Sequence, residues 1–167
     1  ALLTPASLAT HWTGYSRGLA SAGRPVDGAN WRVVRTVLVA PTDAEAERRL
    51  LHAQSSVFFY YDYIRQVLTK AGKVVALKSD PQMADSEVTG RSVMMSRVIF
   101  GSPATVRDKL IALRDSVGPF DHLLVSGMDW SGPNEEWERE SLTLLGQEVW
   151  PAVRRHYAQS GQGLAAQ

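Results

Sequence analysis

"GSPATVRDKLIALRDSVGPFDHLLVSG", residues 101–127, predicts a helix that leads directly into an apolar strand. Ser102 and Pro103 are typical of an N-cap and a first helical residue, because the missing N–H of proline costs nothing there. Valine and leucine then recur at helical spacing as far as Gly118. Residues 120–126 are apolar on both faces, so we expect a strand with neighbours on both edges and cover above and below.

A second strand of the same kind is predicted earlier in the chain. Residues 31–39, "WRVVRTVLV", carry valine and leucine on both faces, as in a buried parallel sheet. Thr42 and Glu45 then indicate a capping box at the start of a helix. Strands that alternate with helices in this way predict the α/β class with parallel pairing.

The rest of the chain reads mainly as helix, with one unclear region. Pro5 begins a predicted helix, another runs to Gly72, and a long C-terminal helix is expected to kink at Pro151. Residues 73–78 are a weak strand candidate, and residues 79–90 read as a polar loop. Periodicity does not decide between helix and strand for 91–100. We expect residues 1–157 to form one domain and 158–167 a disordered tail.

Too few strands are predicted for a sheet that stands alone. Two or three parallel strands leave rows of unpaired N–H and C=O groups beside exposed valines and leucines. We therefore expect the neighbouring strands to lie outside this sequence, in a missing N-terminal part of the same barrel or in a partner subunit. The chain begins with Ala1 rather than methionine, which agrees with that expectation.

Composition excludes several classes of function. The 167 residues are 44% hydrophobic and 21% charged, with a net charge of +1, so nothing favours a nucleic acid or an anionic membrane as partner. The absence of cysteine excludes disulfides, thiolate metal sites and cysteine nucleophiles, and it suits a cytoplasmic location. The four histidines lack metal-ligand spacing, so no metal is expected. His122, inside a predicted strand, is expected to be a hydrogen-bonded structural histidine.

Three stretches together resemble a known family. The strings "WRVVRTVLVAPTDAEAE", "VIFGSPATVRDKLIALRDSVGPFDHLLVSGMDW" and "ESLTLLGQEVWP" occur in that order, separated by a polar insertion. Their order and spacing are similar to the C-terminal portion of the bacterial luciferase-like flavin-dependent monooxygenases. The resemblance covers most of residues 4–157.

The resemblance implies a partial (β/α)8 barrel. Residues 31–39 would be strand seven and residues 120–126 strand eight, with the family's insertion near the active-site mouth within 55–97 and a long C-terminal helix. Strands one to six would be absent. It also implies reduced flavin mononucleotide (FMN), often supplied by a reductase, which activates O2 to oxygenate a small organic substrate. Some relatives instead use the deazaflavin F420 for hydride transfer.

Active sites of such barrels lie at the C-terminal ends of the strands, where two candidate groups occur. Thr42 follows the first strand, although capping alone explains it. After the second strand, Ser126, Gly127 and Met128 would let a flat ring approach the backbone, with Trp130 as a wall. One branch of the family carries a tyrosine where this chain has Met128, so that branch's chemistry is not expected. The alternative interpretation is that these residues form an ordinary strand-to-helix loop with no role in flavin binding.

Arg91, at the end of the insertion, is a candidate anion clamp on a lid; a solvated loop arginine is the alternative. No catalytic residue is assigned, because no Ser-His-Asp spacing, phosphate loop or dinucleotide fingerprint occurs.

Three functional hypotheses follow. The first is the C-terminal part of a flavin-dependent monooxygenase that is inactive without the other barrel strands. The second is a truncated, non-catalytic relative that acts as an oligomerising interaction module through its apolar strand edges and the aromatic helix at 57–68. The third is an F420-dependent oxidoreductase. Under any of them we expect a homo-oligomer.

Overall fold

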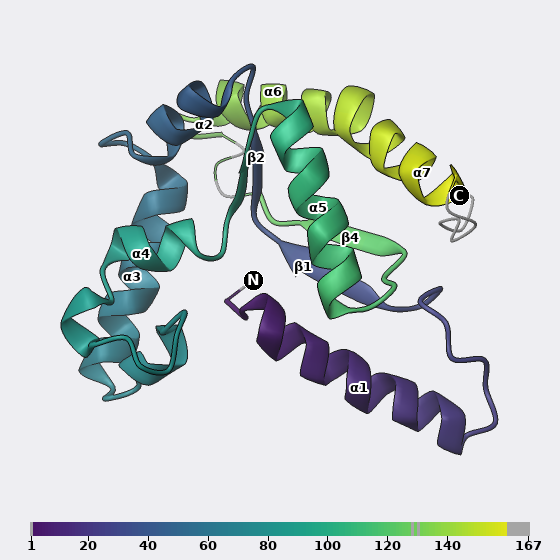
Figure 1. The fold of residues 1–167 in the computed structure, drawn as a ribbon. Helices are drawn as coiled ribbons and strands as arrows, with labels where there is room; N and C mark the ends of the chain where they lie inside the picture. Colours follow the sequence, from purple (N-terminus) through teal and green to yellow (C-terminus); the bar gives the residue numbers. More distant parts are fainter. Residues whose placement is uncertain (1, 128, 130, 160–167) are drawn as a thin grey trace.

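The computed structural model describes residues 2–127, 129 and 131–159, and its elements alternate as an α/β protein (Figure 1). The single predicted strand at 31–39 is divided at Thr36 into two short strands. The elements, in chain order, are α1 (Pro5–Ser21), β1 (Arg32–Arg35), β2 (Val37–Val39), α2 (Asp43–Leu50), α3 (Ser56–Lys70), η1 (Val74–Leu77), η2 (Asp85–Glu87), α4 (Gly90–Met95), β3 (Ile99–Gly101), α5 (Pro103–Val117), β4 (His122–Val125), α6 (Glu135–Leu144), η3 (Leu145–Val149) and α7 (Trp150–Gln159).

The helices begin where their capping residues predict. Thr4 caps α1 and Ser102 caps α5, and each is followed by proline at the first helical position. The Oγ1 of Thr42 accepts a hydrogen bond from the N–H of Glu45 at 3.1 Å, which begins α2. These hydroxyls satisfy backbone donors that have no acceptor within the helix.

The sheet is built from two parallel pairs around one central strand. β1 pairs with β4 and β2 pairs with β3, both in parallel. The carbonyl of Arg35 accepts from the N–H of Ser126, and the carbonyl of Thr36 accepts from the N–H of Ile99. Successive carbonyls of a strand point to opposite edges, so β4 and β3 flank the central strand on opposite sides. Within the described residues, β3 and β4 each have one strand neighbour, so both keep an unpaired outer edge.

One face of the sheet is covered by helices along its whole length. Val33, Val37 and Val39 point to this face and join a core built with α1, α5, η3 and α7. Val106, Leu110 and Leu113 of α5 fill its centre. Figure 1 shows α5 in front of β1 and β4, with α6 and α7 crossing beyond the end of β2.

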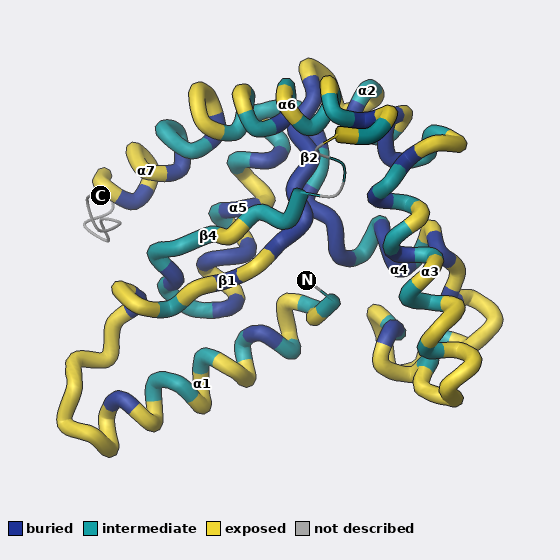
Figure 2. The backbone as a smooth tube through the Cα atoms, turned by 180° about the vertical axis from the view of Figure 1, so that it is seen from behind, coloured by how far each residue is buried: buried dark blue, intermediate teal, exposed yellow. Residues whose placement is uncertain are grey.

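The other face is covered over only part of its length. Leu38 of β2 packs into a second core with α2, α3 and α4, and Thr36 beside it hydrogen-bonds the hydroxyl of Tyr61 at 3.0 Å. Val34, which is two residues before Thr36 and on the same face of the strand, is 44% exposed. The residues of the insertion therefore cover β2 and leave β1 open on this side (Figure 2).

Several expectations need correction. The strand at 31–39 is buried on both faces only in β2, and β4 is half-buried, because α3 and α4 do not extend over β1 and β4. Residues 74–77 form a 3-10 helix rather than a strand. Residues 91–100 divide, with α4 ending at Met95 and β3 starting at Ile99, so both predictions for this stretch are partly right.

The C-terminal helix is interrupted just before Pro151. A π-helical turn, η3, separates α6 from α7. Proline has no N–H for a carbonyl in the preceding turn, and such interruptions are typical of π-bulges. Helix α7 continues to Gln159, two residues into the range predicted as a tail, and residues 160–167 lie outside the described part of the chain.

Candidate functional site

The face of β1 and β4 that no helix covers is apolar and exposed, and it lies near the predicted site. Val34 and Leu124 lie opposite each other in register and are 44% and 46% exposed. Their strand neighbours Val33 and Leu123 point to the opposite face, against the helices. In a (β/α)8 barrel the helices cover the outer face of the strands, and an open apolar face opposite the helices is consistent with the interior of a partial barrel.

The first group of predicted site residues follows β4. The N–H of Ser126 donates to the carbonyl of Arg35 at 2.9 Å, and its hydroxyl donates to the same oxygen at 3.3 Å. Gly127 comes next, and the loop then closes through a hydrogen bond of 2.8 Å from the N–H of Asn134 to the carboxylate of Asp129. Met128 and Trp130 lie outside the described residues.

Thr42 lies at a different level of the sheet. Ser126 stands opposite Thr36 in the middle of the central strand, whereas Thr42 lies three residues beyond Val39, the last residue of that strand. The strand from Thr36 to Val39 alone rises roughly 10 Å at about 3.3 Å per residue, before the chain bends at residues 41 and 42. Thr42 and Ser126 are thus offset along the sheet, and their joint role in binding a cofactor stays a prediction.

A carboxylate beyond the end of β2 makes two hydrogen bonds to the start of α5. Asp43 accepts a hydrogen bond from the N–H of Ser102 at 2.6 Å and another from the hydroxyl of Thr105 at 2.9 Å. These two donors lower the pKa of the Asp43 carboxyl below its ordinary value. The first turns of α2 and α5 are joined by this contact, which explains the negative residue after Thr42.

Arg91 is an exposed surface residue. Its guanidinium pairs with Glu47 of α2 at 3.1 Å, and the two side chains are 60% and 45% exposed. The pair joins α4 to α2 on the outside of the insertion. This matches the solvated alternative more closely than the anion clamp, and the clamp stays an untested prediction.

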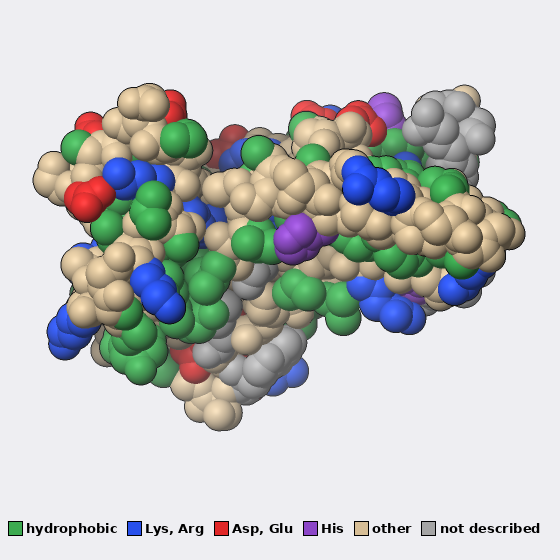
Figure 3. Space-filling view, turned by 90° about the horizontal axis from the view of Figure 1, so that it is seen from below, with side chains coloured by type: hydrophobic (Ala, Val, Ile, Leu, Met, Phe, Trp, Pro, Cys, Tyr) green, Lys and Arg blue, Asp and Glu red, His purple; other side chains and the backbone are tan. Residues whose placement is uncertain are grey.

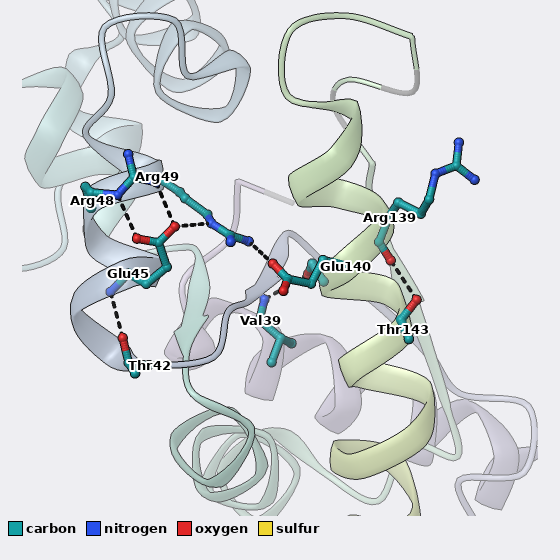
Figure 4. Close-up of polar contacts among 9 residues, drawn as sticks. Val39, Thr42, Glu45, Arg48, Arg49, Arg139, Glu140 and Thr143 are labelled. Carbon is teal, nitrogen blue, oxygen red and sulfur yellow. Dashed lines mark hydrogen bonds and ion pairs between the residues drawn. The ribbon is translucent and has the colours of Figure 1, made fainter.

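A polar network that sequence reasoning missed locks α2 to α6 (Figure 4). The buried guanidinium of Arg49 donates from Nε to Glu45 at 2.7 Å, and its Nη1 forms an ion pair with Glu140 at 2.6 Å. Because Arg48 and Arg49 donate to its carboxylate, the pKa of Glu45 is lowered to about 2. Glu45 was expected to complete a capping box; its carboxylate serves this ion-pair network. The spacing of Glu45 and Arg49, four residues apart, was the only signal in the sequence.

A further contact from α6 closes the end of the central strand. The hydroxyl of Ser141 accepts a hydrogen bond from the N–H of Val39 at 2.8 Å, and both residues are buried. A serine in the middle of a predicted helix gave no signal for this role. Together with the Arg49 pairs, it holds α6 across the C-terminal end of β2.

The histidines and the helices carry no further site. His122 bonds the carbonyl of Ala29 at 3.0 Å through Nε2, as expected of a structural histidine. Across residues 2–127, 129 and 131–159, no three His, Asp or Glu side chains come together as a metal site would require. None of the helices in that part of the chain combines the length and hydropathy needed to cross a bilayer.

The described residues fit one wall of a flavin site. Val34 and Leu124 offer a flat apolar surface, and Gly127 beyond β4 has no side chain to obstruct a ring. The basic residues of β1 and β4 on this face, Arg32 and His122, lie at the N-terminal end of the strands, away from the end at which such barrels bind ligands. The phosphate of a flavin would therefore need donors from outside this face.

Comparisons with known proteins agree with this geometry. The chain is 26% identical over 147 residues to 3,6-diketocamphane 1,6-monooxygenase of Pseudomonas putida, covering 88% of this chain and 38% of the relative. It is 27% identical over 154 residues to 2,5-diketocamphane 1,2-monooxygenase 2 of the same organism, covering 87% and 40%. The chain is therefore similar to the diketocamphane monooxygenases over most of its own length. No protein-family model matches it.

A solved structure of a diketocamphane monooxygenase shares the fold. It is the oxygenating constituent of the 3,6-diketocamphane enzyme from the CAM plasmid of Pseudomonas putida, a type II Baeyer–Villiger monooxygenase in complex with FMN. The TM-score is 0.76 at 26% identity, over 90% of this chain and 41% of that one. The chain thus spans about 40% of the length of the diketocamphane monooxygenases that it matches. The predicted resemblance to flavin-dependent monooxygenases is confirmed.

Proposed function

We propose that this chain is the C-terminal section of a (β/α)8 barrel in an FMN-dependent monooxygenase, and that it needs further barrel strands to act. The observation that carries the proposal is the open apolar face of β1 and β4. Val34 and Leu124 lie in register and remain 44% and 46% exposed, while the opposite face is packed under helices. Barrel closure would bury both side chains, since the strand interior of such barrels is a packed core.

The proposed role of the chain in the reaction follows from its strand face on β1 and β4 and from the loop after β4. Reduced FMN, when bound, supplies the electrons that activate O2. Val34 and Leu124 would exclude water from one side of the ring, and the absence of a side chain at Gly127 would let the ring lie close to the backbone there. The insertion carrying α3 and α4 packs over Thr36 and Leu38 but leaves Val34 and Leu124 uncovered, so other barrel segments would have to shield this face from solvent.

The substrate class comes from the relatives. Diketocamphanes are cyclic ketones, and the solved relative is a Baeyer–Villiger enzyme, so a small ketone is the proposed substrate. Baeyer–Villiger oxygenation inserts one oxygen atom beside the carbonyl carbon. FMN is favoured over F420 as cofactor, because the solved relative contains FMN. The predicted cytoplasmic location and homo-oligomer remain parts of this proposal.

The chain alone should not catalyse this reaction. A reactive flavin–oxygen site needs an enclosed, dry pocket with fixed dipoles, and one wall does not provide it. The test compares the 167-residue chain with a longer polypeptide that supplies the remaining strands. Reduced FMN binding and ketone-dependent O2 consumption by the longer form only would support the proposal; a longer form that binds neither FMN nor ketone would refute it. Titration with F420 in parallel would separate the hydride-transfer alternative.

A second candidate function rests on α3. Phe59, Tyr63 and Val67 recur every four residues and are 71%, 54% and 42% exposed. The rings of Phe59 and Tyr63 stack at 6.3 Å between centroids. Such a stripe would suit a contact with a second copy in a non-catalytic interaction module. Sedimentation of the chain and of Phe59→Ser tests it: a dimer that the substitution dissociates supports the module, and a monomer in both cases rejects it.

A further inference from the structure

A cleft on the helix-covered side of the sheet is separate from the proposed flavin wall. It has a volume of about 320 Å³ and lies between the start of α1, the connection from α4 to β3, and α5. Figure 3 shows the molecule from below the view of Figure 1, with α1 extending across the right of the view and the block formed by α3 and α4 at the left. The cleft is lined by Leu3, Pro5, Arg35, Met95, Ser96, Arg97, Val98, Ile99, Lys109, Ala112, Leu113 and Ser116.

Arg35 enters this cleft from β1 and is incompletely paired. The residue is only 2% exposed, and its Nη1 donates to the carbonyl of Leu3 at 3.0 Å. Its Nη2 is buried and has no hydrogen-bond partner within the described residues. Burial lowers the pKa of the Arg35 guanidinium below its usual value, and the charge of Arg97 adds to this effect.

Arg97 lies beside it and is paired only with neutral groups. It is 3% exposed and donates to the carbonyl of Leu2 at 2.8 Å, the carbonyl of Leu77 at 2.7 Å and the hydroxyl of Ser96 at 2.6 Å. Burial lowers the pKa of Arg97 as well.

Two other buried arginines, Arg49 and Arg114, have acidic counter-ions, which Arg35 and Arg97 do not have among the described residues. Arg49 is held by Glu140 at 2.6 Å, and Arg114 is held by Asp121 at 3.1 Å. None of the residues that line the cleft is acidic, although three of them are cationic. Arginine stays charged in proteins, and a buried charge without a counter-ion is strongly unfavourable.

We propose that this cleft binds a small organic carboxylate, with Nη2 of Arg35 donating to its oxygens, the charge of Arg97 beside it, and its hydrocarbon part against the apolar lining. The planar fork of arginine matches a carboxylate with two parallel hydrogen bonds. Leu113, Ile99 and Met95 supply apolar surface for the rest of the ligand. The volume is near the lower end of small-molecule pockets, which suits a ligand the size of benzoate.

The site does not depend on the proposed function, because it lies on the opposite face of the strand from Val34. The carboxylate has two sources to distinguish, a free organic acid and an aspartate or glutamate side chain of protein. Benzoate represents the first source, and N-acetyl-aspartate amide represents the second. Benzamide, which has the shape of benzoate without its charge, is the neutral control.

The experiment measures binding to the 167-residue chain by calorimetry and by the shift in thermal midpoint. We expect saturable binding of benzoate or of the acetylated aspartate and none of benzamide; the tighter of the two carboxylates identifies the source. Arg35→Met should weaken binding at least tenfold, and Arg35→Lys should restore part of it. Arg139→Met, at an exposed ion pair with Glu135 on α6 outside the cleft, should bind as the parent does.

The outcomes that would overturn the proposal are equally direct. The proposal fails if neither carboxylate binds saturably, or if benzamide binds as tightly as benzoate. It also fails if Arg35→Met binds the carboxylate with the affinity of the parent chain. If Arg35→Met fails to fold, Arg97→Met serves the same comparison. A change in oxygen consumption plays no part in the readout, so failure here is distinct from failure of the monooxygenase proposal.

Discussion

Two adjacent valines of β1 test which face of the sheet the chain itself covers. Val33 is 1% exposed and packs in the helix-covered core, whereas Val34 is 44% exposed on the open face. Both are valines in the same strand, so Val→Ala removes the same atoms and the same strand propensity at both positions. Any difference between the two variants therefore reports packing alone.

The magnitudes follow from the burial of each side chain. A fully buried valine side chain contributes about 1.5–3 kcal/mol, and the cavity left behind adds to the loss. We expect Val33→Ala to lower the free energy of unfolding by about 2 kcal/mol. Val34 already has nearly half its surface in water, so Val34→Ala should cost below about 1 kcal/mol in the isolated chain.

The assay is urea denaturation of both variants, followed by circular dichroism at constant protein concentration. The chain alone should show the large difference between the two positions. When further barrel strands are supplied, the cost of Val34→Ala should rise to about that of Val33→Ala. Equal costs at both positions in a monomeric isolated chain would refute the reasoning, because they would show that Val34 is already covered.

Three further predictions concern stability, each measured by denaturation of the variant beside the parent. Ser141→Ala should cost about 1–3 kcal/mol, since the buried N–H of Val39 loses its acceptor; no loss would contradict the contact. Burial raises the pKa of Tyr157 to about 12. The tyrosine therefore ionises at a lower pH in the unfolded chain than in the folded one, and the free energy of unfolding should fall between about pH 10 and 12. Tyr157→Phe should remove this part of the alkaline loss, and an unaltered pH profile would contradict it. Gly28→Ala would place a Cβ 1.3 Å from the carbonyl oxygen of Pro119, so a loss of at least about 2 kcal/mol is expected, and full stability would exclude this approach of the two segments.

Local signals in the sequence predict much of the secondary structure. Proline after a capping hydroxyl places the starts of α1 and α5, and the apolar run after Gly118 places β4. These features depend on the dihedral preferences and donors of neighbouring residues, which are visible in a single sequence. The short stretch 91–100 was ambiguous because a helix and a strand share it.

Other features depend on contacts that no local pattern contains. Whether Val34 is buried depends on how far α3 and α4 extend, and the sequence shows only an apolar residue in a strand. Arg35 reads as an ordinary strand residue, yet its partner is the carbonyl of Leu3, far away in the chain. The site residues illustrate the same limit, since the separation of Thr42 and Ser126 follows from the register of β4 on β1.

The central claim is that the chain holds one part of a flavin-dependent barrel and cannot act by itself. The most direct measurement is the reoxidation of reduced FMN by O2 in a stopped-flow instrument, with and without the purified 167-residue chain, in the presence of a cyclic ketone. The account predicts the same rate as free reduced FMN and no oxygenated ketone. Formation of oxygenated ketone by the isolated chain would contradict it.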